Sequence, residues 1–176
     1  AAFGEYATPL AGNCNARNCL AVIAAAESMG ADRESVRESL LSFRSVKRRM
    51  EVRAEVEGVR IIDDFAHHPT AVRETLQALR LKYPDDRLIA IYEPRSLTSR
   101  QRIFQHDYAS AFVDADIAVI ADLFEPSRYA EHDRLSTDEL VRQQHGRDAS
   151  YHPCVPPDAV AFAQSTQEVS AIVKRL

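Results

Sequence analysis

Two short apolar runs, LIAIY at 88–92 and IAVIA at 117–121, constrain the fold more than any other feature of the chain. Neither run alternates apolar with polar residues, which is typical of strands that are buried on both faces. One predicted helix, near 69–82, precedes the first run, and another, near 98–113, separates the two runs. This alternation predicts an α/β fold with a mostly parallel sheet and helices on both of its faces.

Two helices are expected before this alternating part. Apolar residues at helical spacing run from Cys19 to Ala26, and Gly30 follows them as a left-handed C-terminal cap would. Asp32 is placed to cap a second helix. The basic connector RSVKRR at 44–49 has no apolar period, so we predict a domain boundary after residue 45.

A β-hairpin is predicted after the connector. Apolar and charged residues alternate over 50–56, and Gly58 lies at a tight turn into VRIID at 59–63. We also expect this second strand to be the first strand of the parallel sheet. The remaining predicted elements are helices near 136–145 and 166–175, which Ser136 and Ser165 would cap, and a weak strand at 149–152.

Composition excludes several classes of protein. A formal net charge of -4 over 176 residues gives no general attraction to nucleic acid or to an anionic membrane. The longest apolar stretch, at 19–26, is too short to span a bilayer, and no secretory signal opens the chain. Cys14, Cys19 and Cys154 form no CxxC, which favours reduced structural thiols over a metal site. We therefore expect a cytoplasmic protein that binds neither nucleic acid nor membrane.

The ends of the chain predict that it is a fragment of a longer protein. Its first residue is not Met, and its last helical pattern runs to Leu176 without a capping glycine.

Polar segments follow each predicted strand of the sheet: DDFAHHPT at 63–70, EPRSLTSR at 93–100 and DLFEPSR at 122–128. Ligands of open parallel sheets bind beyond the carboxyl ends of the strands, so we search these segments for a site.

The first segment favours a nucleotide. Asp64 suits a pair of sugar hydroxyls or a metal-bound water, and the imidazoles of His67 and His68 suit a nucleotide. A helix that begins at Pro69 adds N–H groups that attract phosphate or carboxylate. The alternative is structural: Asp63 and Asp64 pair with nearby arginines, and His68 caps the helix.

The second segment favours a carboxylate ligand. Arg95 and Arg100 flank the hydroxyls of Ser96, Thr98 and Ser99, and a guanidinium binds a carboxylate through two parallel hydrogen bonds. The alternative is a helix start that Ser96 or Thr98 caps, with solvated arginines around it.

Two further groups of residues suit a nucleotide. Asn15 and Asn18 lie three residues apart at the start of a helix, where they either contact an adenine edge or cap the helix. The basic run at 47–49 is either a solvated face or a contact to polyphosphate. The chain has no GxxxxGK[ST], GxGxxG, GxSxG or HExxH motif, so a phosphate-binding loop would lie elsewhere in the protein.

Four motifs occur in order: GNCNARN at 12–18, RRMEVR at 48–53, DDFAHHPTAV at 63–72 and YEPRS at 92–96. Together they resemble the C-terminal part of the Mur ligases, the ATP-dependent amide-forming enzymes of peptidoglycan synthesis. The resemblance implies that 1–45 is the tail of the central ATPase domain, and that 46–176 is the Rossmann-like C-terminal domain without its last strand. The N-terminal and central domains of the same protein would then be its partners, and ATP and Mg²⁺ would be bound mostly outside this chain.

The resemblance also implies roles for individual residues. Asn15 and Asn18 match asparagines near the adenine, and Arg49 matches the catalytic arginine that reaches the ATP phosphates. Asp64 matches the aspartate that binds the ribose, and Cys14 replaces a family histidine. His67 and His68 would lie beside the nucleotide, and the acceptor would contact Phe65, Arg95, Ser96, Thr98 and Arg100.

DDFAHHPTA and EPRS most resemble the branch that joins UDP-N-acetylmuramate to the tripeptide L-alanyl-γ-D-glutamyl-meso-diaminopimelate in peptidoglycan recycling. The resemblance implies an acyl phosphate that the amine of the tripeptide attacks, and an isolated fragment without activity. The first alternative is the branch that adds L-alanine, which has Tyr at Phe65 and a His-Arg pair at Pro94 and Arg95. The second is a nucleotide- or peptide-binding module without catalysis.

Overall fold

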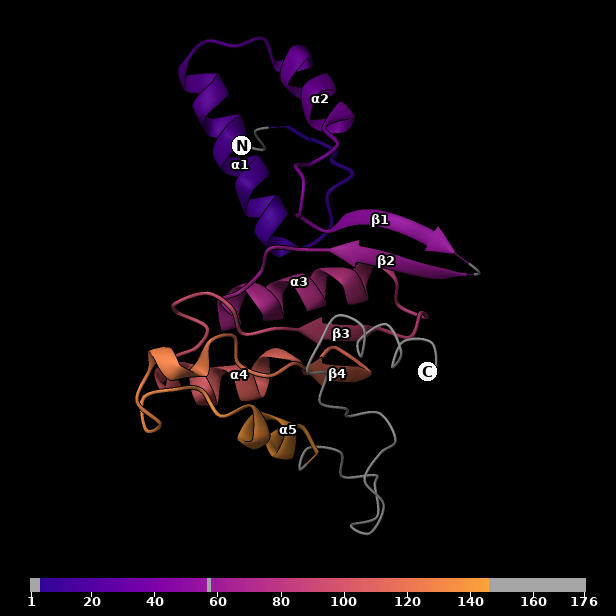
Figure 1. Ribbon diagram of the computed structural model, residues 1–176. Coiled ribbons are helices and arrows are strands. Elements are labelled where there is room, and N and C mark those ends of the chain that lie inside the picture. The colour runs from indigo at the N-terminus through magenta and orange to yellow at the C-terminus, as the bar shows by residue number, and fades with distance from the viewer. Residues whose placement is uncertain (1–3, 57, 146–176) are drawn as a thin grey trace. The chain divides into compact units, whose positions relative to one another are not determined.

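The computed structural model describes residues 4–56 and 58–145, which divide into two compact units (Figure 1). The hairpin unit takes residues up to Phe65 together with Gln77–Pro84, and the parallel-sheet unit takes Ala66–Leu76 and the residues from Asp85 onward. The predicted domain boundary after residue 45 is a different division and stays a prediction. The predicted strand at 149–152, the helix near 166–175, Ser165 and Cys154 lie outside the described residues.

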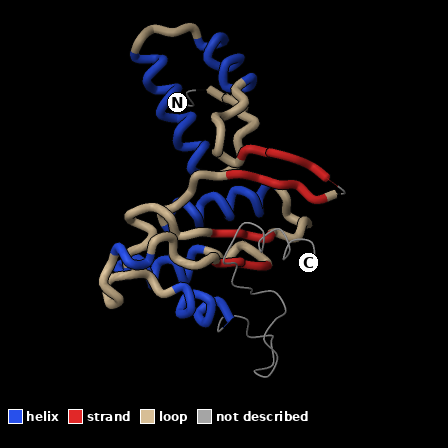
Figure 2. The backbone as a smooth tube through the Cα atoms, in the orientation of Figure 1, coloured by secondary structure: helices blue, strands red, loops and turns tan. Residues whose placement is uncertain are grey.

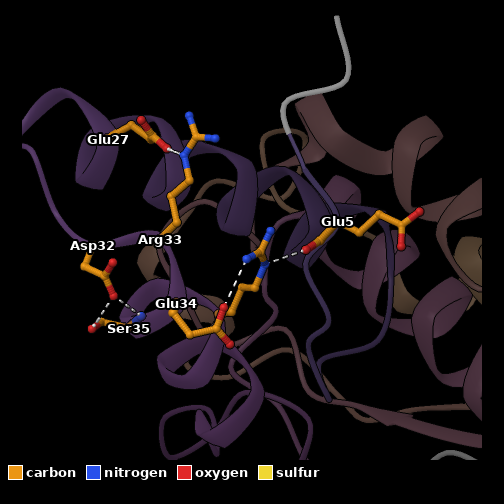
Figure 3. Close-up of polar contacts among 7 residues, drawn as sticks. Glu5, Glu27, Asp32, Arg33, Glu34 and Ser35 are labelled. Carbon is orange, nitrogen blue, oxygen red and sulfur yellow. Dashed lines mark hydrogen bonds and ion pairs between the residues drawn. The ribbon is translucent and has the colours of Figure 1, made fainter.

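The hairpin unit begins with the two predicted helices, α1 (Asn13–Ser28) and α2 (Arg33–Ser42). Gly30 follows α1 with a φ of 73°, the left-handed conformation that glycine adopts without steric cost. The Asp32 carboxylate caps α2, since its Oδ2 accepts hydrogen bonds from Ser35 N at 2.9 Å and Ser35 Oγ at 3.0 Å (Figure 3). These bonds from Ser35 hold the pKa of Asp32 below its usual value. Both predicted caps are confirmed.

Arginines join α2 to its neighbours in the hairpin unit (Figure 3). Arg33 pairs with Glu27 of α1, and Arg37 pairs with Glu34 within α2 at 3.1 Å. Arg37 Nε also donates to the backbone oxygen of Glu5 at 3.1 Å. The apolar stripe predicted for α1 buries little surface. Within the described part of the chain, Ile23 is the one buried residue of this helix.

A β-hairpin follows, as predicted, with β1 (Glu51–Val56) and β2 (Val59–Asp63) antiparallel and a bulge between Val52 and Ala54. The prediction that β2 is also the first strand of the parallel sheet is wrong for the described residues. Its backbone pairs with β1 instead, and the described strands form two two-stranded sheets (Figure 2). DDFAHHPT therefore follows a strand of the hairpin.

The parallel-sheet unit contains β3 (Ile89–Tyr92) and β4 (Ile117–Ile120), which are parallel and in register from Ile89 opposite Ile117. All four residues of β4 are buried, and their side chains alternate, so both faces of this strand are covered. Helix α3 (Pro69–Lys82) contributes its first half to this unit. The core includes Val72, Leu76, Tyr92, Tyr108, Phe112, Ile120, Leu135 and Leu140.

The helix predicted near 98–113 begins later and is shorter than expected. The backbone of Gln101 is extended and forms a bridge with Arg134, and Leu135 N donates to Arg100 O at 2.8 Å. These bonds to residues more than thirty positions away replace the first helical turns. The helical elements of this region are a 3₁₀ turn at Arg102–Phe104 and α4 at Gln105–Ala111.

Helix α5 (Thr137–His145) lies where the sequence predicts it. Ser136 Oγ accepts a hydrogen bond from Glu139 N at 3.2 Å, which is one half of the predicted capping box. The other half is replaced, because Gln105 Oε1 accepts from Ser136 N at 2.8 Å. Between β4 and α5 the chain forms a loop with a 3₁₀ turn at Pro126–Arg128.

Candidate functional site

The basic connector has an unusual backbone in the hairpin unit. Ser45, Arg48 and Met50 have φ values of 68°, 58° and 45°, a left-handed region that costs a residue with a side chain about 1 kcal/mol. Two carboxylates hold this conformation: Asp64 Oδ2 accepts from Met50 N at 2.8 Å, and Glu51 Oε2 accepts from Arg48 N at 2.8 Å. The bond from Arg48 lowers the pKa of Glu51. The predicted ribose ligand Asp64 is thus bonded to the connector.

Phe65 lies against the arginines of the connector. The guanidinium carbon of Arg48 is 4.8 Å from the centroid of the Phe65 ring, and that of Arg49 is 6.0 Å away. Arg48 also pairs with Asp63 at 3.6 Å, which is the structural alternative that the sequence left open for this aspartate. Phe65 is half exposed.

Arg49 lines a cleft of about 480 Å³ in the hairpin unit. Two more cations, Arg44 and Lys82, line the same cleft, together with the aromatic rings of Phe43 and Tyr83. No acidic residue is among the described residues that line it. Positive charge beside apolar walls suits an anion that has an apolar part, such as a nucleoside phosphate.

The predicted asparagines lie at the start of α1. Asn15 Nδ2 donates to Ala11 O at 2.7 Å, and Ala11 lines the same cleft. Gly12 precedes this turn with a φ of 92°, and a Cβ built on it would be 2.4 Å from the Cβ of Ala78. Glycine is therefore required where the chain enters α1, while Asn18 is exposed on its first turns.

In the parallel-sheet unit, two buried tyrosines hold the backbone of His67. Tyr92 Oη donates to His67 O at 3.1 Å or to Tyr108 Oη at 2.9 Å, and Tyr108 Oη also donates to His67 O. Burial raises the pKa of both tyrosines above the usual value, so both keep their protons. Periodicity places these residues in the core, but it gives no signal of the bonds that their hydroxyls make.

His68 caps α3. Its Nδ1 accepts from Thr70 N at 3.3 Å, and its ring lies edge-on to Phe104 with centroids 5.0 Å apart. This is the structural alternative for His68, and it fixes the imidazole of His68 at the start of the helix. Contact of His67 and His68 with a nucleotide stays a prediction.

Arg100 and Arg95 differ sharply within the second segment. Arg100 is 2% exposed; its Nη1 donates to Phe124 O at 2.9 Å, and its Nε donates to Ser96 O at 3.3 Å. Arg95 is exposed, with its guanidinium carbon 4.4 Å from the Phe124 ring centroid and its Nη1 3.9 Å from Glu93. Of the two guanidinium groups, that of Arg95 is the one placed to meet a ligand.

This segment forms a turn that the Ser96 hydroxyl and the backbone oxygen of Thr98 stabilise. Ser96 Oγ accepts from Ser99 N at 3.0 Å, and Thr98 O accepts from Gln101 N at 3.2 Å. The predicted capping by Ser96 is present, although it closes a turn and not a helix.

The two units divide the predicted residues between them. Asn15, Asn18, Arg49, Asp64 and Phe65 belong to the hairpin unit, and His67, His68, Arg95, Ser96, Thr98 and Arg100 belong to the parallel-sheet unit. Over 4–56 and 58–145, no three His, Cys, Asp or Glu side chains are placed to hold a metal ion. In the same ranges no helix has the length and apolarity that crossing a membrane requires.

Comparison with known proteins adds a family and its relatives. The family model described as Mur ligase, glutamate ligase domain, matches residues 48–173. A UDP-N-acetylmuramate–L-alanine ligase of Roseiflexus sp. is 39% identical over 71% of this chain and 26% of its own length. Seven further curated relatives, 35% to 38% identical, carry the same name. The chain spans between about a quarter and a third of the length of these relatives.

Solved structures give the same fold. UDP-N-acetylmuramate-alanine ligase from Thermotoga maritima matches 96% of this chain and 33% of its own, with a TM-score of 0.72 and 22% identity. A murein peptide ligase from Psychrobacter arcticus matches 97% of this chain and 32% of its own, with a TM-score of 0.60 and 28% identity. The first likeness, at this identity, is evidence of the fold alone.

Proposed function

The chain belongs to the Mur ligase family, and we propose that it is the acceptor-binding, ATP-closing part of an ATP-dependent amide ligase. The family match over residues 48–173 carries this proposal. The chain has the α/β, Rossmann-like fold of the family's C-terminal domain, with β3 and β4 in its parallel sheet. The chain spans about a quarter to a third of the length of these relatives, which supports the proposal that an N-terminal domain and most of a central domain lie elsewhere in the protein.

For the division of the chain, residues 1–45 are proposed as the tail of the central ATPase domain and 46–176 as the C-terminal domain. The left-handed residues of the connector support a hinge at this boundary, since strained backbone is common where segments move. The reaction is placed in the cytoplasm, where ATP is available.

The cleft around Arg49, whose described lining contains cations and no acidic residue, fits the charge of ATP. ATP with Mg²⁺ would supply the phosphoryl group that activates the carboxylate of UDP-N-acetylmuramate. Arg49 then stabilises negative charge on the transferring group, with Arg44 and Lys82 as further cations. Asn15 and Asn18 are assigned to the adenine and Asp64 to the ribose, with His67 and His68 beside the nucleotide. Through its bond to Met50 N, Asp64 also couples a bound ribose to the connector.

The proposed acceptor is the murein tripeptide, as in murein peptide ligases. Phe65 and the sequence EPRS at 93–96 support this choice, since both resemble that branch of the family. Arg95 is exposed and suits a carboxylate of the acceptor, while Ser96 and Thr98 form the turn behind it. Arg100 is assigned to holding this turn against Phe124 O. Contact of Phe65 and Arg100 with the acceptor stays a prediction.

A second candidate acceptor is L-alanine. It is favoured by the names of the curated relatives, which are UDP-N-acetylmuramate–L-alanine ligases at up to 39% identity.

The test uses the complete protein that contains this chain, with ATP, Mg²⁺ and UDP-N-acetylmuramate. Product is measured by mass spectrometry and phosphate release, with the tripeptide or with L-alanine as acceptor. We expect the ratio of kcat/KM for the tripeptide to that for L-alanine to be about 100 or more. The 176-residue chain alone serves as a control and should form no product.

The opposite preference would assign the enzyme to L-alanine. Absence of ATP-dependent product with both acceptors would overturn the ligase proposal and favour a binding module without catalysis.

A further inference from the structure

A second cleft, of about 410 Å³, lies in the parallel-sheet unit. Its described lining comes from Arg102, from the segment that follows β4 and from the residues around the start of α5. Among the described residues, its charged lining consists of two guanidinium groups and three carboxylates, from Arg102, Arg134, Asp122, Glu131 and Asp138. The described lining of the cleft in the hairpin unit contains no acidic residue, so the two clefts suit different ligands.

In this second cleft the two arginines have ion-pair partners, whereas two of the aspartates have none among the described residues. Arg102 Nη2 lies 3.3 Å from a carboxylate oxygen of Glu139, and Arg134 Nη2 lies 3.7 Å from one of Glu131. The carboxylates of Asp122 and Asp138 have no hydrogen bond or ion pair within the part of the chain that the structure describes. The cleft therefore offers two carboxylates that no described residue pairs with, and guanidinium groups line it as well.

Backbone hydrogen bonds fix this cleft beside the segment that contains Arg95. Arg102 N donates to Asp133 O at 2.8 Å, and Leu135 N donates to Arg100 O at 2.8 Å. Gln101 and Arg134 also form an isolated antiparallel bridge. The proposed acceptor residues and the cleft thus form one bonded structure inside a single unit.

We propose that this cleft binds an end group that carries both an ammonium and a carboxylate. The ammonium pairs with Asp122 and Asp138, and the carboxylate pairs with Arg134 or Arg102, as charge-assisted hydrogen bonds require. The inference rests on the proposed function: the distal centre of meso-diaminopimelate, at the far end of the tripeptide, is such an end group. L-Alanine has a single amine, which is the nucleophile of the reaction. It therefore cannot bind this cleft through that amine while it reacts.

The test compares Asp122→Asn/Asp138→Asn with wild type in the complete protein. With the tripeptide as acceptor we expect KM to rise about tenfold, the effect of losing exposed charge contacts, while kcat stays unchanged. With L-alanyl-γ-D-glutamate, which lacks the end group, KM should be the same in both proteins. Asp85→Asn removes an exposed carboxylate outside the cleft and is the matched control.

Free meso-diaminopimelate provides a binding measurement that does not depend on catalysis. Calorimetry should detect it on the wild-type protein and on Asp85→Asn, with about tenfold weaker binding to the double variant. If the double variant binds meso-diaminopimelate more weakly but the complete protein shows no ligase activity, the site is supported and the proposed function is overturned. If the tripeptide KM and the binding of meso-diaminopimelate are both unchanged in a correctly folded double variant, the site is overturned. Asp122→Glu keeps the charge and should bind the probe as wild type does.

Discussion

The basic connector at 44–49 and the segment at 93–100 each contain arginines that the sequence links to a ligand, yet the side chains are used differently. In the connector all the arginines are exposed, and the carboxylates of Asp64 and Glu51 bond to the backbone. In the second segment, buried Arg100 bonds through its guanidinium group to two backbone oxygens.

This difference separates binding from support. The Arg100 guanidinium is held by two backbone oxygens and the Glu125 carboxylate, and at 2% exposure it presents hardly any surface to solvent. An exposed guanidinium beside an aromatic ring, such as Arg95 or Arg49, keeps its donors available to a ligand. Substitution of the buried arginine should therefore lower stability more, and substitution of an exposed arginine should lower activity more.

Arg100→Met should have the largest effect on stability. It leaves Phe124 O without its guanidinium donor and removes one of the two donors to Ser96 O, which also accepts from Ser99 Oγ at 3.1 Å. It also removes the 3.7 Å ion pair with Glu125, and we expect the free energy of unfolding to fall by about 3 kcal/mol. Urea unfolding followed by circular dichroism measures this change. Arg95→Met is the matched control, with an expected loss of about 0.5 kcal/mol or less. Equal losses in the two variants would contradict the contrast between a supporting and a binding arginine.

Tyr108→Phe should have the next largest effect. The hydroxyl that bonds His67 O is lost, while Tyr92 remains as a donor, so we expect a loss of about 1 kcal/mol at pH 8. Burial raises the pKa of Tyr108 in the folded protein, which means that the folded state holds this proton more strongly. This contribution to stability is complete below the unfolded tyrosine pKa of about 10 and is lost as pH rises above it.

Urea titrations between pH 8 and pH 11 test the same residue. The decline of stability above about pH 10 should be shallower for Tyr108→Phe than for wild type. An identical decline would show that Tyr108 does not titrate with unfolding.

Asp64→Ala should have a smaller effect, of about 1 kcal/mol or less, because Met50 N is only partly buried. Asp63→Ala removes an exposed ion pair with Arg48 and should change stability by a few tenths of a kcal/mol. In the complete protein, calorimetry compares the ATP affinity of the Asp64→Ala and Asp63→Ala variants. Weaker ATP binding by Asp64→Ala alone supports its assignment to the ribose, and unchanged binding contradicts it.

Features that depend on neighbours in the sequence were predictable, and features that depend on distant partners were not. Gly30, Asp32 and Ser136 act within their own turns, so local chemistry was sufficient to predict them. The late start of α4 depends on bonds between 100–102 and 133–135, which no local pattern indicates. Likewise, the burial of Arg100 depends on a carbonyl oxygen twenty-four residues away.

Arg49→Ala should have the smallest effect on stability and a large one on activity. The side chain is exposed and its closest aromatic contact, Phe65, is 6.0 Å away, so we expect a change of about 0.5 kcal/mol or less in the free energy of unfolding. In the complete protein kcat should fall about 100-fold, the typical cost of one lost donor to a developing charge. Lys47→Ala is the control, because it removes a charge from the same connector but does not line the cleft. A similar fall in kcat for both variants would assign the effect to the overall charge of the connector, whereas a fall for Arg49→Ala alone requires a specific contact.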